Sequence, residues 1–373
     1  MKIVITVFQN IYAINGTTVR VHRVLELIKK KHEVAVITCS DKGQTRLKGI
    51  EDVRIIDIKG IRIGLLKHRF VPVKFPPIII WNLIQALSLL KNKFDIVYCA
   101  HSWFGFPSIY LVSKLRRYKI IFEAHSILSE EAKEVGHSGV GLRLRQFWER
   151  FVIRHSDCII ALSQNTFGFY RPYNNMIELV PVFIEDDLFR TSKEKAKEGG
   201  SKLVGLIGPF DTTRNLDSLR LLYSRINEFN NRLHFVVIGR CEHRKQNHRI
   251  EYTGYLQSTQ DYIDQLSRLD AVLVTEKIAT SGPLNKIIEP MACGIPVFTT
   301  PKGLVGLHWV EPGKDIFVFE EDRLVDEINK TVFDNEVMRM VGENAREVVE
   351  RYYSRKANED KLLRILGELV SKV

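Results

Sequence analysis

The chain has 373 residues, of which 45% are apolar, and a formal net charge of +11. This length exceeds what one ordinary hydrophobic core supports, so it predicts two domains of usual size. The five cysteines, an odd number without a C-x-x-C spacing, argue against a disulfide framework and favour a reducing compartment. The first residues, MKIVITVF, lack the pattern of a signal peptide, and we expect a cytoplasmic protein.

The positive charge is unevenly distributed along the chain. Residues 1–188 hold 27 Lys and Arg against 17 Asp and Glu, a net charge of +10, whereas the remainder holds 28 against 27. Such a field attracts an anionic partner, for example a phospholipid or a phosphate-bearing acceptor. A solvated basic surface without a specific partner fits the count equally well. Nucleic-acid binding would rest on charge alone, without a motif, and is not expected.

Short apolar, β-branched runs alternate with stretches of helical spacing along the chain. Runs of this kind are typical of strands buried on both faces of a parallel sheet, and the alternation predicts doubly wound α/β domains. In the first half they are residues 2–8, 32–38, 53–58, 95–101, 119–125, 158–163 and 177–183. In the second half they are residues 202–208, 234–239, 250–254, 271–276, 296–301 and 316–321.

The polar, charged segment 191–201 separates the two series of strands. It ends in Gly-Gly-Ser and reads as a linker. We therefore expect one domain over residues 1–190 and a second over residues 202–354, with a C-terminal helix at about 355–373 that packs back on the first domain. Two such domains place a ligand cleft between them, at the carboxyl ends of both sheets.

One segment, residues 70–90, is apolar enough to raise the question of a membrane. Lys74 and three prolines interrupt it, and about 14 residues remain after Pro77, fewer than the roughly 20 that a bilayer-spanning helix needs. A buried helix with proline at its start is the favoured interpretation. An apolar patch at a membrane interface is the alternative.

The strongest local motif is SGPLNKIIEPMACGIPVFTT, residues 281–300. A Ser-Gly turn before a helix offers backbone N–H groups to a phosphate. Glu289 follows about two helical turns later, where its carboxylate can accept hydrogen bonds from two vicinal hydroxyls such as those of a ribose. On spacing alone, an exposed helix residue is an equally good interpretation of Glu289.

This segment resembles the nucleotide-binding signature of the retaining GT-B glycosyltransferases of family 4, the glycosyl transferases group 1. The signature matches Glu289, residues 291–294, Pro296 and Val297. The resemblance implies an α/β fold of GT-B architecture, with two Rossmann-like doubly wound domains facing across a cleft. It also implies that Glu289 holds the ribose of the donor, next to a turn formed by Ser281, Gly282, Leu284 and Asn285.

Further segments are similar to the same family. GPFDTTRNLDSL, residues 208–219, places Arg214 where a lysine usually grips the donor diphosphate, followed by Asn215. Residues 250–256, which include Tyr255, resemble the segment that flanks the base. Asn15 and Gly16 stand at the glycine loop of the first domain. Two departures are Pro209, where an arginine is usual, and Ser281, where a glutamate is usual.

His101 and His125 each end a strand-like run, where side chains of a doubly wound sheet reach the ligand site. His125 matches the family's histidine near the donor sugar, and we expect it, with Arg214, to be catalytic. A structural histidine remains open at both positions. Asp186 and Asp187 form an acidic pair, but we expect no metal site, because cations and helix N-termini can neutralise the diphosphate.

The resemblance implies transfer of a sugar from a nucleoside-diphosphate sugar to a glycan or lipid-phosphate acceptor, with retention of configuration. No cofactor and no metal are expected, and peripheral association with an anionic membrane, at the inner membrane face, agrees with the charge. A sugar-nucleotide epimerase or hydrolase and a non-catalytic sugar-nucleotide-binding subunit are the alternatives. A nicotinamide dehydrogenase is disfavoured, because no G-x-G-x-x-G follows the first strand.

Overall fold

The computed structural model describes residues 1–11, 16–39, 53–58, 78–190, 200–210, 213–256, 258–277, 279 and 281–371. The chain forms two compact units: Met1–Val180 with Glu359–Val373, and Pro181–Asn358. Most of the expected linker, residues 191–199, lies outside the described residues. The terminal helix α14, Arg355–Ser371, begins in the second unit, and its residues from Glu359 onward are part of the first unit.

The first unit is built on a parallel sheet whose described strands follow the order β3-β2-β1-β4-β5-β6-β7. Its central strands are buried along almost their whole length, as their apolar sequences require. The chain runs outward in one direction from β1 and in the other from β4, so the switch point lies between these strands. The strands are β1 Lys2–Thr6, β2 Glu33–Thr38, β3 Arg54–Asp57, β4 Ile96–Ala100, β5 Lys119–Ala124, β6 Cys158–Ala161 and β7 Ile177–Leu179.

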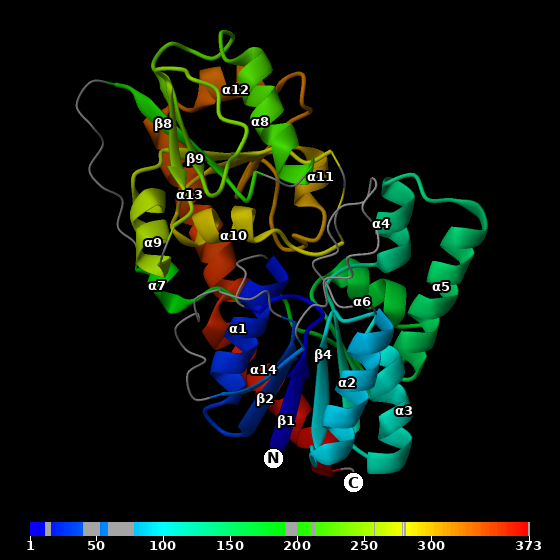
Figure 1. Cartoon of the computed structure of the whole chain (residues 1–373). Coiled ribbons are helices and arrows are strands. Elements are labelled where there is room, and N and C mark those ends of the chain that lie inside the picture. Colours follow the sequence, from blue (N-terminus) through cyan, green and yellow to red (C-terminus); the bar gives the residue numbers. More distant parts are fainter. Residues whose placement is uncertain are drawn as a thin grey trace. The chain divides into compact units, whose positions relative to one another are not determined.

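Helices connect these strands and cover the sheet. In Figure 1, α2 and α3 run next to each other on the first unit, in keeping with their close packing. The helices of this unit, besides α14, are α1 Gly16–Ile28, α2 Ile78–Lys91, α3 Phe106–Arg116, α4 Leu128–Glu134, α5 Gly139–Arg154 and α6 Gln164–Tyr170.

Helix α2 is the described part of the apolar segment 70–90. One face is buried through Trp81 and Leu89, but the side chains of Ile79 and Leu83 are 81% and 59% exposed, and Leu87 is exposed as well. The expectation of a buried helix is therefore wrong for the face that carries these exposed side chains. Within the described ranges, no helix combines the length and the apolar character needed to cross a bilayer.

The second unit contains another parallel sheet, with the described strands in the order β10-β9-β8-β11-β12-β13. Its switch point lies between β8 and β11, which are neighbours in the sheet. The strands are β8 Lys202–Ile207, β9 Leu233–Ile238, β10 Ile250–Gly254, β11 Ala271–Val274, β12 Val297–Thr299 and β13 Phe317–Val318. The helices are α7 Asp186–Phe189, α8 Thr213–Arg225, α9 Thr259–Ser267, α10 Asn285–Ala292, α11 Pro301–Leu304, α12 Leu324–Thr331 and α13 Asn335–Tyr353.

Candidate active site

Helix α10 carries the residues of the strongest sequence motif. Ile287, Ile288 and Met291 are fully buried and fix the inward face of this short helix. Glu289 lies among them and is only 9% exposed, so the interpretation as an exposed helix residue is wrong. The Tyr262 hydroxyl of α9 donates a hydrogen bond of 3.0 Å to Glu289 Oε2, which holds the carboxylate in one orientation.

The turn before α10 is tightly packed. Ser281 and Gly282 are buried, and Leu284 in extended conformation precedes the first helical residue. Gly306, with a φ of +91°, lies so close to the backbone of Gly282 that a Cβ atom at Gly306 would meet the Gly282 carbonyl carbon at 2.5 Å. Asn285 Oδ1 is buried without a hydrogen-bond partner among the described residues, the kind of atom that a ligand hydroxyl can satisfy.

Helix α8 begins after the carboxyl end of strand β8, which is a neighbour of β11 in the second sheet. Gly208 has a φ of +152°, and a Cβ atom there would meet the Asn215 amide at 2.6 Å, so glycine is required for this approach. Asn215 Nδ2 donates to the Pro209 carbonyl at 3.1 Å. In the next turn of α8, the Ser218 hydroxyl donates to the Thr275 carbonyl after β11 at 3.1 Å, which ties the two loops together.

Two residues that the sequence did not single out join these loops. Lys286 of α10 forms an ion pair with Glu276, which follows β11 and is completely buried. Lys286 Nζ also donates to Asn215 Oδ1 at 2.7 Å. The sequence could have identified Lys286 as a site residue, because it precedes Glu289 by three positions and residues three apart share one face of a helix.

The remaining predicted donor-site residues are Tyr255, Arg214, Asn15 and Gly16. Tyr255 follows β10 at the same edge of the second sheet, with a side chain that is 53% exposed. Arg214 lies in the first turn of α8, and its side chain is outside the described residues, as is Asn15 altogether. Gly16 begins α1 of the first unit, and a Cβ atom there would meet nothing within 4 Å.

His125 follows β5 in the first unit and is part of a buried charged network. Its Nε2 lies 2.7 Å from Glu123 Oε1, while Arg20 of α1 pairs with Glu123 Oε2 at 3.0 Å. The Tyr98 hydroxyl also donates to Glu123 Oε2. Because an ionised carboxylate only accepts hydrogen bonds, Nε2 of His125 carries the proton in this pair.

The network keeps Glu123 ionised. Burial alone would raise the pKa of Glu123, but the Arg20 guanidinium, helped by His125 and Tyr98, lowers it to about 2. The pKa of the Tyr98 hydroxyl is raised, first by burial and then by the Glu123 charge. A carboxylate fixed in this way sets the orientation of the His125 ring and can stabilise positive charge on it.

The imidazole ring of His101 stacks on that of His125. The two rings are stacked with centroids 4.8 Å apart, and the backbone N–H of His125 donates to His101 Nδ1 at 3.3 Å. Burial, and then the neighbouring His125, lower the pKa of His101 to about 3, so His101 is neutral at physiological pH. Its φ of +49° is rare for a non-glycine residue and is the kind of strain found at functional sites. The sequence predicted the two histidines but not Glu123, Arg20 or Tyr98.

Among the described residues, no group of three or more His, Cys, Asp or Glu side chains is arranged to hold a metal ion. Asp187 pairs with the exposed Arg190 at 3.7 Å on the surface helix α7.

Two family models match the chain, one for each half. Glycosyltransferase Family 4 matches residues 14–188, and Glycosyl transferases group 1 matches residues 201–334. No curated protein sequence matches significantly.

Solved structures with low sequence identity have a similar fold over nearly the full length of the chain. Sucrose-phosphate synthase from Thermosynechococcus elongatus superimposes with a TM-score of 0.79 at 14% identity, over 100% of both chains. Anabaena HepE, solved with UDP and glucose, gives a TM-score of 0.72 at 15% identity, over 98% of this chain and 99% of that chain. The lipopolysaccharide outer core galactosyltransferase WaaB gives a TM-score of 0.66 at 13% identity, over 99% of each chain.

The two family models, the paired parallel sheets and the full-length structural likeness agree with the fold class expected from the sequence. The chain belongs to the family 4 glycosyltransferases, the glycosyl transferases group 1, has the α/β GT-B fold and is an enzyme that transfers a sugar from a nucleotide sugar.

Proposed function

We propose that the nucleoside-diphosphate sugar binds at the carboxyl edge of the second sheet, with its ribose on Glu289. The observation that supports this most directly is the nearly buried Glu289 carboxylate, which Tyr262 holds in place on the helix that follows the Ser281–Gly282 turn. A carboxylate can accept several hydrogen bonds at once, so two vicinal hydroxyls can share it.

The diphosphate then lies at the N-terminal ends of α10 and α8. The first backbone N–H groups of a helix point outward without intrahelical partners, and the helix dipole favours an anion there. Arg214, in the first turn of α8, adds a positive charge that stabilises the diphosphate as it leaves. We propose that these groups replace a metal ion. UDP-glucose is the first donor to test, because HepE was solved in complex with it.

His125 is proposed to act near the donor sugar. Its Nε2–H is donated to the ionised Glu123 at 2.7 Å, so the neutral ring can only accept a hydrogen bond at Nδ1. The protonated ring can donate to a sugar oxygen from Nδ1 and carry positive charge while the bond to the leaving group breaks. We propose that transfer proceeds with retention of configuration at the anomeric carbon. The product's anomeric configuration, read by NMR, tests this assignment, and an inverted product contradicts it.

The donor site is tested by comparing two single variants. Glu289→Ala removes a charge-assisted contact to two hydroxyls and is expected to weaken donor binding by about 2–3 kcal/mol. Ser281→Ala removes one neutral hydrogen bond, worth about 0.5–1.5 kcal/mol. Calorimetric titration of the donor into both variants gives the order. A larger loss for Ser281→Ala reverses the two roles.

We propose that the acceptor is an anionic lipid phosphate or a membrane-borne glycan, reached from an anionic membrane surface. Helix α5 supports this proposal, because its outward face combines apolar side chains with arginines. Val140, Leu144 and Phe147 recur at helical spacing and are 72%, 63% and 68% exposed. The acidic residue of α5, Glu149, points inward and accepts a hydrogen bond of 2.5 Å from the Tyr170 hydroxyl.

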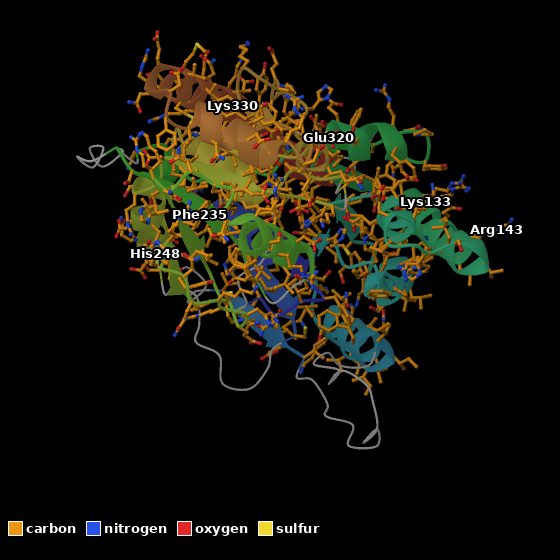
Figure 2. All side chains as sticks on the ribbon, turned by 90° about the horizontal axis from the view of Figure 1, so that it is seen from above. Lys133, Arg143, Phe235, His248, Glu320 and Lys330 are labelled. Atoms are coloured by element: carbon orange, nitrogen blue, oxygen red, sulfur yellow. The ribbon has the colours of Figure 1, made fainter. Side chains whose placement is uncertain are left out.

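Arginines border this apolar stripe. A groove of about 450 Å³ runs along α5, lined by Arg143, Gln146, Phe147, Arg150, Phe151, Arg154 and His155. Figure 2 shows the Arg143 side chain pointing away from the ribbon. An apolar stripe with arginines on the same face is the pattern of a helix that lies in the interface of an anionic bilayer.

Vesicle binding tests this part of the proposal. Binding should rise with the fraction of anionic lipid and weaken with salt, because each basic residue near such a surface contributes about 1 kcal/mol. Arg150→Gln is expected to weaken binding about fivefold. Arg351→Gln is the matched control, because Arg351 stacks on Tyr352 at 5.3 Å much as Arg150 stacks on Tyr173 at 5.2 Å, but in the second unit. Equal binding to neutral vesicles, or equal losses in both variants, contradicts the proposal.

A further inference from the structure

Lys286 is placed where three loops of the second unit meet. It lies in the first turn of α10, Asn215 lies in the first turn of α8, and Glu276 follows β11 by two residues. Strands β8 and β11 are neighbours, so the loops that follow them lie together at the carboxyl edge of the sheet. This edge is the proposed site of the donor diphosphate.

The side-chain contacts hold the lysine in this position. Lys286 Nζ pairs with Glu276 and donates to Asn215 Oδ1 at 2.7 Å. Glu276 is itself fixed, because its backbone N–H donates to Thr300 Oγ1 at 3.1 Å and the Thr300 hydroxyl donates back to the Glu276 carbonyl at 3.0 Å. The ammonium group is thus anchored from β11 and from α8.

In the Lys286–Glu276 pair, the lysine is the partner that reaches the protein surface. The Glu276 side chain has no exposed surface, whereas the Lys286 side chain keeps 13% of its surface exposed. A buried carboxylate is strongly unfavourable without a partner, so Glu276 keeps the lysine in place. A ligand that approaches the pair meets the lysine rather than the carboxylate, and an anion is the ligand that this arrangement attracts.

The contacts also connect Lys286 with the loop after β8. Asn215 receives its bond from Lys286 on one side and donates to the Pro209 carbonyl at 3.1 Å on the other. We infer that Lys286 is a second cation of the donor diphosphate site besides Arg214, reaching from α10 to the loop after β8, with Glu276 as its positioning residue. This inference rests on the proposed donor site.

Lys202 offers a closely matched control for a lysine variant. Its side chain is 14% exposed, pairs with Asp270 at 3.4 Å and donates to Asn335 Oδ1 at 2.9 Å. Lys202 is the first residue of β8 and lies at the amino edge of the same sheet, opposite the proposed site. Lys286→Gln and Lys202→Gln therefore remove the same charge from similar surroundings.

The experiment titrates UDP, GDP, ADP and dTDP, each with its parent nucleoside, into wild type, Lys286→Gln, Lys286→Arg and Lys202→Gln. For the diphosphate that binds, Lys286→Gln should weaken affinity about 10- to 100-fold, as for loss of a charge-assisted hydrogen bond. Its affinity for the nucleoside should stay within about twofold of wild type, since ribose and base contacts are retained. Lys286→Arg should recover part of the loss, and Lys202→Gln should change neither.

The outcomes separate the inference from the donor-site proposal. If Lys286→Gln weakens the binding of diphosphate and nucleoside equally, or changes the affinity for neither, Lys286 has no direct role at the diphosphate. The inference then fails while the donor-site proposal stands. If wild type binds none of the four diphosphates, the donor-site proposal fails and the inference with it. Thermal melting of each variant identifies those that have lost the fold, and Lys286→Arg, which keeps the charge, then gives the comparison.

Discussion

Glu123→Gln tests whether the network around His125 is electrostatic in origin. The substitution keeps the shape of the side chain and removes the charge that Arg20 and His125 face at 3.0 Å and 2.7 Å. The pKa of Glu123 is held at about 2 against an ordinary 4.5. At about 1.4 kcal/mol for each tenfold change in an equilibrium, ionised Glu123 contributes about 3 kcal/mol to the stability of the fold at neutral pH.

The pH dependence follows from the direction of this shift. A carboxyl whose pKa is lowered on folding contributes its full stability above the unfolded pKa and loses it as the pH falls toward the folded pKa. For Glu123 this window runs from 4.5 down to about 2. Between pH 7 and pH 3 the wild type should lose about 2 kcal/mol of unfolding free energy that Glu123→Gln does not lose.

Urea unfolding at the two pH values measures this difference. Trp81, Trp103 and Trp148 lie in the first unit and Trp309 in the second, so a Trp309→Phe background makes fluorescence report the first unit. At pH 7 the variant should be less stable by about 3–5 kcal/mol, as for removal of one member of a buried ion pair. Equal losses of unfolding free energy in wild type and Glu123→Gln between pH 7 and pH 3 would show that the Glu123 charge does not stabilise the fold.

The remaining predictions concern turnover and donor binding. Arg214→Ala should lower kcat about a hundredfold or more, as for loss of one group that stabilises transition-state charge, and full activity in steady-state assays removes Arg214 from the site. EDTA should leave the rate of transfer unchanged. The metal-free proposal is contradicted if EDTA abolishes activity and an added divalent metal restores it. His125→Asn should lower kcat about a hundredfold or more with little change in donor Kd; a change confined to Kd shows a binding role only. Tyr262→Phe removes the hydrogen bond to Glu289 and should weaken donor binding by about 0.5–1.5 kcal/mol, whereas an unchanged calorimetric Kd shows that Glu289 needs no such support.

The sequence predicted the strands because apolar, β-branched runs of this length are required where a parallel sheet is covered on both faces. It also predicted the turn and helix of α10, because Ser281, Gly282 and Glu289 follow a recognisable spacing. It could not show that Glu289 is nearly buried against Tyr262, since this contact joins residues 27 positions apart. The periodicity of a sequence reports on residues that are close along the chain, and not on contacts between residues that are far apart in it.

The two buried ion pairs were not predicted from the sequence. Arg20 and Glu123 are 103 residues apart, and each looks alone like an ordinary surface charge. Lys286 and Glu276 are closer, but nothing in their spacing shows that one is fully buried and the other is not. The prediction for helix α2 was wrong for a related reason. Its apolar content predicted burial, but among the described residues Ile79 and Leu83 stay exposed while Trp81 and Leu89 are buried. Burial of charge, and exposure of apolar surface, are decided by tertiary packing.

A crystal structure with the tightest-binding nucleoside diphosphate tests the central claim most directly. We expect both ribose hydroxyls within hydrogen-bond distance of the Glu289 carboxylate, and the phosphates against the Ser281–Gly282 turn and the first turn of α10. A nucleotide bound elsewhere on the chain, or bound here with its ribose away from Glu289, contradicts it.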